Sequence, residues 1–293
     1  MSAYSYGDTT QRESLLNEMM DLDPIDLYFV TNAGSMDVGQ KVHGWNVDPI
    51  TTVSAGAGTA ELADTTYAAT NPEFITNTTQ IIEYGYRVAM SNQNADHAGM
   101  DSKVAREKMK KMKQWKQNLE ISASVGTLVS GTGTAARSMQ GALRYATLTS
   151  GHSGVSLTSD MLNDFLGNAW TAGGDHDTVL VGRVLKQRIS SFTVGNTRNV
   201  AAGEAEIVGR VDVYDSDYGR VDIVLHRYVN QLAANTYNVL ATYIKDYVKV
   251  GYLDEPHDEP RPSTGYFVAG SIVGEATTAL MNRLAASYYR GLL

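Results

Sequence analysis

Cysteine is absent from all 293 residues of this chain, and that absence removes several classes of function at once. Without a thiol, the chain can form no disulfide, no thiolate metal site and no cysteine nucleophile. Its first residues, MSAYSYGDTTQRESLL, lack the basic start and the apolar core of a signal peptide. No apolar run approaches the length of a membrane span. We therefore expect a protein that is made in a cytoplasm and has no membrane partner.

Motifs that bind nucleotides or activate a nucleophile are also missing. The chain has no Gly-x-Ser-x-Gly sequence, no P-loop and no dinucleotide-binding fingerprint. The string Ser130-Gly131-Thr132-Gly133-Thr134 hints at a phosphate cradle, but it lacks the required glycine spacing and the following lysine. We interpret it as a turn. The sequence thus predicts no catalytic residue, no cofactor and no enzyme.

Three clusters of histidine and acidic residues have the side chains that bind metal ions. They are Asp96-His97 with Asp101, Asp175-His176-Asp177, and His257-Asp258-Glu259. None has the His-x-x-x-His spacing of a helical zinc site, and each lies at a predicted loop or helix start, where aspartate caps backbone amides without a metal. We predict no metal site, and a soluble metal-dependent enzyme that uses residues 175–177 remains an alternative.

Positive charge is in deficit, with 24 lysines and arginines against 32 aspartates and glutamates and a net charge of −8. This balance argues against a protein whose main task is to grip nucleic acid, although it is compatible with enclosing it. Hydrophobic residues make up 43% of the chain and charged residues 19%. These values and the length indicate a globular chain of one large or two modest domains.

The most informative block is 158–192, which predicts a helix, a glycine stop, a buried strand and a second helix. Thr158 or Ser159 can cap the first helix, and Gly173-Gly174 can end it. The predicted inward face of this helix consists of Met161, Leu162, Phe165, Leu166, Ala169 and Trp170. The run 178–181 is apolar without alternation, as in a strand covered on both faces. The second helix should bury Val184, Leu185, Ile189 and Phe192.

Outside this block, two long segments have distinct patterns. Residues 35–72 combine an alternating stretch with a run of small residues, which predicts a two-stranded excursion that cannot support its own core. From Asp101 onward the pattern predicts a long helix with a lysine-rich outer face. Its apolar arc contains Val104, Ala105, Met109, Met112, Trp115, Leu119 and Ala123. A solvated lysine face is the plain interpretation, and contact with DNA or a scaffold protein is the sharper one.

Shorter patterns complete the chain. Residues 12–20 predict a short helix, and 74–91 a strand that is interrupted at Gly85. Alternation on both sides of residues 215–219 predicts a hairpin. Residues 255–262, EPHDEPRP, are interpreted as a proline-rich loop, and the last segment as a long strand or a strand followed by a helix.

The block 158–192 resembles the axial-domain segment of the major capsid proteins of tailed bacteriophages (Caudoviricetes) with the Hong Kong 97-type fold. The resemblance is to a branch formerly catalogued as a domain of unknown function. Its matching residues here are Ala172-Gly173-Gly174, Asp177 to Gly182 and Lys186 to Phe192. Arg137, Met139 and Gly141, and the string VDVYDSDYG at 211–219, extend the likeness over roughly residues 12 to 291.

The resemblance implies a mixed α/β (α+β) Hong Kong 97-like capsid fold. Its expected parts are an N-terminal arm at 1–34, an extended loop (a β-hairpin) at 35–73, a peripheral domain at 74–147 with a spine helix at about 101–123, an axial domain at 148–250, and a return to the peripheral domain at 251–293.

It also implies a structural protein of the virion that self-assembles into the pentamers and hexamers of an icosahedral shell around double-stranded DNA. The expected partners are other copies of the chain and, without sequence specificity, the packaged DNA. A scaffolding protein, a decoration or cement protein and a portal are further partners that the sequence leaves open. An encapsulin-like compartment shell on the same fold is the first alternative to this function.

Some capsid proteins of this fold join neighbours through a Lys–Asn isopeptide bond with the lysine on the extended loop. Here Lys41 lies near the base of that loop, and the tip around 53–66 has no lysine. We therefore predict no autocatalytic crosslink.

Overall fold

The computed structural model describes residues 27–48, 58–64, 69–97, 101–132, 134–192, 212–233 and 237–293. By their internal contacts these residues divide into two compact units. Unit 1 comprises the described residues of Glu83–Trp115 and His257–Val273, and unit 2 comprises those of Asp26–Ile82, Lys116–Pro256 and Gly274–Leu293. The helix predicted at 12–20 lies outside the described residues, as do parts of the tip of the predicted extended loop.

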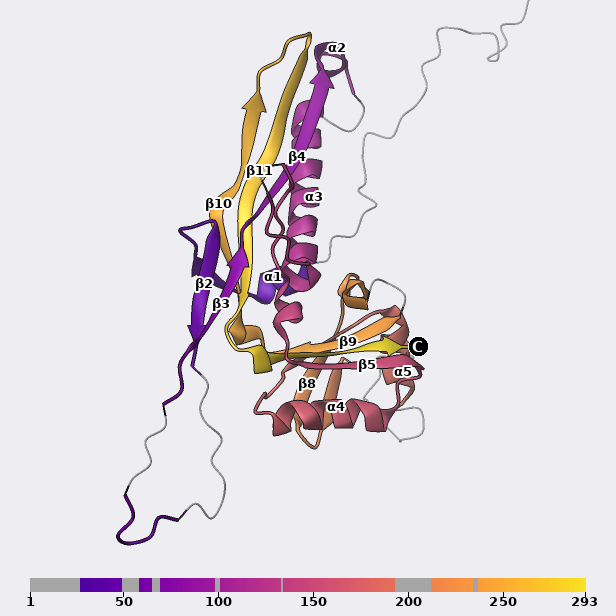
Figure 1. Ribbon diagram of the computed structural model, residues 1–293. Helices are drawn as coiled ribbons and strands as arrows, with labels where there is room; N and C mark the ends of the chain where they lie inside the picture. The colour runs from indigo at the N-terminus through magenta and orange to yellow at the C-terminus, as the bar shows by residue number, and fades with distance from the viewer. Residues whose placement is uncertain are drawn as a thin grey trace, which may run out of the picture. The chain divides into compact units, whose positions relative to one another are not determined.

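The largest layer of unit 2 is a six-stranded sheet with the order β5-β12-β9-β6-β8-β7 (Figure 1). Its strands are β5 (Leu148–Val155), β6 (Thr178–Val181), β7 (Val213–Ser216), β8 (Gly219–Leu225), β9 (Asn238–Tyr243) and β12 (Ala286–Leu292). Neighbours β12–β5 and β6–β8 are parallel, and the other pairs are antiparallel. The sheet is therefore mixed, with β5 and β7 as its two edges. The hairpin predicted around 215–219 is confirmed as β7 and β8.

Two helices, α4 (Ser159–Thr171) and α5 (Arg183–Ser191), flank β6 in sequence and confirm the order predicted for 158–192. The Thr158 hydroxyl accepts a hydrogen bond from the Met161 amide at the start of α4. Gly173, with φ +96°, has the left-handed conformation that ends a helix. All four residues of β6 are buried, as an apolar run without alternation predicts.

The main core lies between these helices and one face of the sheet. Its buried side chains are Leu157, Leu162, Phe165, Leu166, Leu185 and Ile189 against Val179, Val181, Val221, Ile223, Leu240 and Leu292. Of the residues predicted for the inward faces, Met161 and Phe192 are partly buried, and two are exposed: Trp170 by 57% and Val184 by 37%. Trp170 lies at the edge of the apolar arc, beside Tyr218 rather than over the sheet. Lys186 replaces Val184 in the inward arc because its ammonium donates to the Ile223 carbonyl at 2.7 Å.

Short elements cover the other side of the sheet. Helix α1 (Tyr28–Asn32) places Phe29 against Tyr243, with 5.2 Å between the ring centroids. The 3-10 helix η3 (Val229–Ala233) contacts β6, β9 and β12. The remaining 3-10 helices are η2 (Ala142–Tyr145), η4 (Lys245–Tyr247) and η5 (Arg283–Ala285).

A two-stranded sheet is formed by β2 (Val42–Val47) and β3 (Glu73–Thr78), which confirms antiparallel pairing in this part of the chain. Its inner face presents Trp45 opposite Ile75, both buried. The Trp45 indole donates to the Leu280 carbonyl at 3.1 Å, which anchors the hairpin base. On its outer face Phe74 is 66% exposed, and its ring fills the space where Gly44 has no Cβ.

A four-stranded sheet has the order β1-β10-β11-β4. Its strands are β1 (Gly34–Asp37), β4 (Gln80–Ala89), β10 (Val248–Arg261) and β11 (Phe267–Leu280). The prediction of an interruption at Gly85 is wrong, because β4 continues through it to the short helix α2 (Met90–Gln93). The segment after β11 contains strand β12 and no α-helix.

The prediction of a loop at 255–262 is also wrong, because β10 runs on through Pro256 and Pro260 to Arg261. Strand β1 pairs with β10 only from Lys249 to Tyr252. Because the two prolines are four residues apart in a strand, their missing N–H groups lie on the same edge. Proline is tolerated where that edge has no partner strand.

The long helix predicted from Asp101 is α3 (Lys103–Val125). Trp115, Leu119 and Ala123 of its predicted apolar arc are buried, whereas Met109 is 55% exposed. None of residues 103–114 is buried. The stripe predicted from periodicity therefore becomes a core face only in the second half of the helix. No helix among the described residues is long and apolar enough to cross a bilayer.

Candidate assembly surfaces

The predicted cluster Asp175-His176-Asp177 does not converge on a common point. The His176 ring is buried, with Nδ1 2.6 Å from the Thr242 hydroxyl and Nε2 3.0 Å from the Leu284 carbonyl. Since the carbonyl can only accept, Nε2 carries the hydrogen and Nδ1 accepts from Thr242. Burial lowers the pKa of His176. Asp177 instead accepts from the Thr178 hydroxyl at 2.8 Å, and both ring nitrogens are engaged by the protein's own groups.

The other two clusters are likewise used by the fold. In unit 1 the Asp258 carboxylate accepts from the Lys108 ammonium at 2.6 Å and the Tyr86 hydroxyl at 2.8 Å. Burial alone raises the pKa of Asp258, but these two hydrogen bonds outweigh it and the net pKa is lowered. His97 contacts the Asn92 carbonyl through Nε2 at 2.5 Å. Within the described ranges, no three histidine or acidic side chains are grouped closely enough to hold a metal ion.

Of the Ser130–Thr134 string, the described residue Thr132 is hydrogen-bonded to Ala135. The amide of Thr132 donates to the Ala135 carbonyl at 3.1 Å, and the Thr132 hydroxyl accepts from the Ala135 amide at 3.2 Å. A phosphate cradle needs amides that point outward, and the Thr132 amide is already used. Lys41, Ile81 and Thr132 are among the residues that line a hollow of about 330 Å³.

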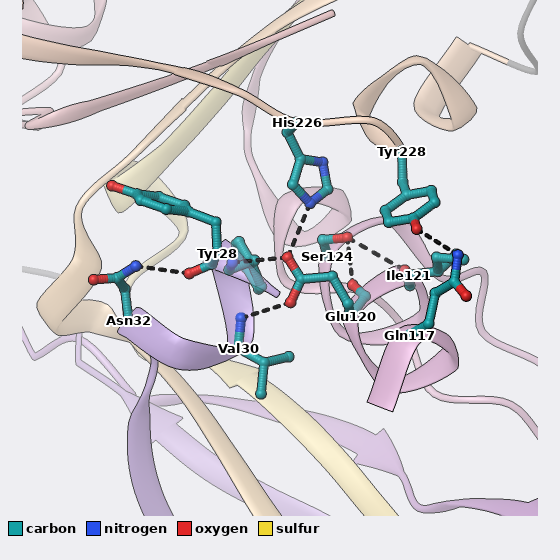
Figure 2. Close-up of polar contacts among 10 residues, drawn as sticks. Tyr28, Val30, Asn32, Gln117, Glu120, Ile121, Ser124, His226 and Tyr228 are labelled. Carbon is teal, nitrogen blue, oxygen red and sulfur yellow. Dashed lines mark hydrogen bonds and ion pairs between the residues drawn. The ribbon is translucent and has the colours of Figure 1, made fainter. Parts of the chain in front are cut away.

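The strongest polar centre in unit 2 was not predicted as a site. Glu120, on α3, is wholly buried, and its carboxylate accepts from the amides of Phe29 at 2.7 Å and Val30 at 2.8 Å (Figure 2). The His226 Nε2 lies 3.1 Å from the same carboxylate. Helix α1 has no side-chain cap of its own, so Glu120 supplies the acceptor that its first amides need.

The Glu120 contacts join three segments that are far apart in sequence: the start of the described chain, α3 and the segment after β8. A further hydrogen bond also joins α3 to the segment after β8: the Gln117 side-chain amide donates to the Tyr228 hydroxyl at 2.6 Å (Figure 2). Both oxygens of this buried carboxyl group are engaged by the protein's own groups, so its contacts hold these segments together. The sequence feature that could have indicated this buried acid is its position directly after Leu119, in the buried half of α3.

What remains available for other molecules is exposed apolar surface. Leu62 near the hairpin tip is fully exposed, Phe74 is 66% exposed and Trp170 is 57% exposed. Trp170 has the ring of Tyr218 beside it, with 6.2 Å between centroids. Large apolar side chains on the surface mark contact sites for proteins when they gather. Among the described residues, Trp170 and Tyr218 form such a group.

The fold defines the class. The fold is similar to that of a solved structure, the capsid of a native GTA particle, with a TM-score of 0.69 at 11% identity over 99% of this chain and 98% of that one. The capsid of Myoviridae phage XM1 matches with a TM-score of 0.63 at 12% identity, over 96% and 97%. Phage G, whose structure contains major capsid and decoration proteins, matches with 0.61 at 9% identity over both whole chains. The fold is Hong Kong 97-like, as predicted.

The sequence itself narrows this class to a family. Residues 3–292 match the family model of the SU10 major capsid protein, so the chain belongs to that family. A comparison with curated protein sequences finds no significant match. The protein has a structural role in a phage capsid shell and belongs to the virion. The family match does not favour the encapsulin-like alternative.

Proposed function

We propose that this protein self-assembles, without catalysing a reaction, into the pentamers and hexamers of an icosahedral shell that encloses double-stranded DNA. The observation that carries the proposal is the family match over residues 3–292. Exposed apolar side chains such as Leu62, Phe74 and Trp170 support it, because a lone subunit leaves them in water. Weak individual contacts suffice, since each subunit touches several neighbours and stability accumulates across the lattice.

In this proposal, residues 1–34 act as the arm and 35–73 as the extended loop that overlaps a neighbour. Residues 74–147 and 251–293 form the peripheral domain, although β12 within the second range pairs in the six-stranded sheet. Residues 148–250 form the axial domain. The net charge of −8 suits a lining that encloses DNA without holding it tightly.

Electron microscopy of the purified full-length protein tests the proposal. We expect closed icosahedral particles, and small discrete oligomers would contradict it. Nuclease-resistant double-stranded DNA in particles from infected cells would distinguish a genome shell from a cargo compartment. A scaffolding, decoration or portal protein would appear in the same particles as an additional band on a denaturing gel.

The absence of a crosslink remains a prediction. Lys41 uses its carbonyl to accept from the Thr79 amide at 2.9 Å, which fixes its backbone at the base of the hairpin. We expect particles heated in denaturant to run as a single band at 31.8 kDa. A ladder of covalent multimers would contradict this expectation.

A further inference from the structure

Helix α4 carries an aromatic projection on one of its flanks. Tyr218, in the turn between β7 and β8, packs on α4 where Gly167 has no side chain; a Cβ there would lie 2.8 Å from the tyrosine ring. Trp170 follows one helical turn later, at 6.2 Å between ring centroids. Tyr218 is 45% exposed and Trp170 is 57% exposed. We call this pair, Trp170 and Tyr218, the aromatic knob.

The other flank of α4 borders a groove. It has a volume of about 400 Å³ and lies between α4 and the strands β5 and β12, with mostly apolar walls. Its lining includes Leu148, Thr149, Phe165, Asn168, Ala172 and Tyr289. Strand β5 is an edge of the sheet, so the groove lies at the open border of the sheet. We call it the β5 groove.

The helical periodicity explains why knob and groove lie on opposite flanks. At about 100° per residue, Asn163, Gly167 and Trp170 form one stripe, and the Asn163 amide oxygen accepts from Tyr214 at 2.7 Å on the hairpin side. Asn168 and Ala172 lie roughly 150° away on the groove side. The core residues Leu162, Leu166 and Ala169 lie between the two stripes. A surface that projects on one flank and recedes on the other can pair head to tail, and head-to-tail contacts of this kind can close into rings.

The β5 groove also matches the Trp170 side chain in size and chemistry. A tryptophan side chain buries about 150–250 Å² when it is covered, and pockets of about 300–1,000 Å³ enclose groups of this size. The indole N–H needs an acceptor once it is buried, and the hydroxyl of Thr149 at the edge of the groove can supply one. The groove therefore has room for the Trp170 ring and a partner for its one polar atom.

Charges beside the two surfaces are opposite in sign. Asp217 directly precedes Tyr218 in the turn between β7 and β8, so an acidic residue lies beside the knob. At the β5 edge, the exposed Arg290 lies opposite Gly151, with its Nε 3.5 Å from where a Cβ of that glycine would lie. This complementarity favours a second copy of the same chain as the occupant of the groove.

We propose that the aromatic knob of one copy inserts into the β5 groove of the next copy, and that this heterologous contact joins axial domains into rings. The inference rests on the proposed function, because it names the surfaces through which the shell's rings form. Aromatic side chains in such pockets dominate binding energy, and truncating one weakens a contact by roughly 30-fold or more.

The first test removes the knob and fills the groove in separate full-length variants. Trp170→Ala with Tyr218→Ala deletes the knob, and Thr149→Trp fills the groove from an exposed strand position. We expect each variant to remain folded by circular dichroism and to form neither rings nor shells. Val184→Ala removes an exposed apolar side chain from α5 of the same domain and should assemble normally. Normal assembly of either interface variant would overturn the proposal.

The second test is positive and uses the absence of natural cysteine. A double variant with Tyr218→Cys and Thr149→Cys, assembled into particles and treated with a short bis-maleimide, should give a ladder of covalent multimers on a denaturing gel. Each single-cysteine variant should run as a monomer on the same gel, because the contact joins unlike surfaces and only one of them then carries a cysteine. Particles without a ladder would overturn this inference and leave the proposed function standing. A wild-type chain that forms no particles would overturn the proposed function instead.

Discussion

The six-stranded sheet of unit 2 and the helix-and-strand layer of unit 1 are stabilised in different ways. Side chains on both sides of β6 are fully buried, and Leu180, Leu185 and Val239 have no exposed surface. In unit 1, by contrast, residues 103–114 of α3 all retain some exposure. Its prominent contacts are polar or charged: Lys108 with Asp258, Arg261 with Glu83 at 2.8 Å, and the Arg87 guanidinium 3.5 Å above the Phe267 ring.

The difference teaches where each region obtains its stability. Burial of apolar surface contributes roughly 25 cal/mol per Å², so the sheet with its helices supplies its own driving force. Half-exposed ion pairs contribute about 0–1 kcal/mol each and are screened by salt. Unit 1 therefore has little core of its own, which fits a region that gains stability from neighbours in an assembled shell.

The largest expected effect comes from the buried acid of unit 2. Replacing Glu120 by alanine should lower the free energy of unfolding by about 3–5 kcal/mol, because the amides of Phe29 and Val30 lose their acceptor and His226 loses its partner. Urea unfolding of the unassembled full-length subunit measures this. Glu107→Ala is the matched control on the same helix. Glu107 forms ion pairs with Lys103 at 3.4 Å and Lys110 at 3.5 Å, and its loss should cost at most about 1 kcal/mol. Equal losses would contradict the contrast.

A second comparison tests the apolar core. Leu185→Ala should lower the free energy of unfolding by about 2–5 kcal/mol, because the side chain is fully buried and leaves a cavity. Met109→Ala removes a side chain of similar size from α3 in unit 1, where it is 55% exposed, and should change the value by no more than about 0.5 kcal/mol. The same urea experiment measures both. A loss of more than about 2 kcal/mol in the free energy of unfolding for Met109→Ala would contradict this prediction, because it would indicate that Met109 lies in an apolar core.

A smaller effect should appear as a pH dependence of unit 2. Burial lowers the pKa of His176 from its ordinary value of 6.5, so the unfolded chain takes up a proton before the folded one does. Stability from the neutral ring is therefore complete above about pH 6.5 and is lost as the pH falls toward the lowered folded value. Between pH 7 and pH 5.5, His176→Gln should lose less stability than the wild type. Parallel curves for the two proteins would contradict this assignment.

The smallest expected effect belongs to the ion pair of unit 1. The side chains of Lys108 and Asp258 are 40% and 30% exposed, so Lys108→Met should cost at most about 1 kcal/mol. The cost should decrease further in 0.5 M salt, because screening weakens the pair that the substitution removes. Thermal unfolding at low and high salt measures both quantities. A large, salt-independent loss would indicate that the pair is structurally buried.

Local patterns were sufficient to predict the elements of the block 158–192. The cap at Thr158, the stop at Gly173 and the apolar run at 178–181 each depend on neighbouring residues, and the structure confirms all three. The prediction of a loop at 255–262 was wrong. Proline prevents strand pairing only on the side where its N–H is missing, so it can occur in a strand that has no partner on that side. Whether a strand has a partner on that side is decided by residues far away in sequence.

The candidate sites show the same division between what local sequence predicts and what distant residues decide. Histidine and acid clusters could be located from sequence, yet only the fold shows that His176 is engaged by Thr242 and Leu284, and Asp258 by Lys108 and Tyr86. Glu120 was missed because an acid in a helix is ordinarily solvated, and its partners lie 90 or more residues away. The knob was missed because helical periodicity placed Trp170 at the edge of an inward arc.

By itself, the sequence determined the class of protein: no thiol chemistry, no nucleotide or nucleophile motif, and an ordered set of motifs similar to phage capsid proteins. It also determined the elements whose formation depends on spacing, such as α4, β6 and α5. Only the tertiary structure decided which apolar side chains stay outside, because burial depends on what lies opposite. It left Trp170, Phe74 and Met109 exposed and buried Glu120.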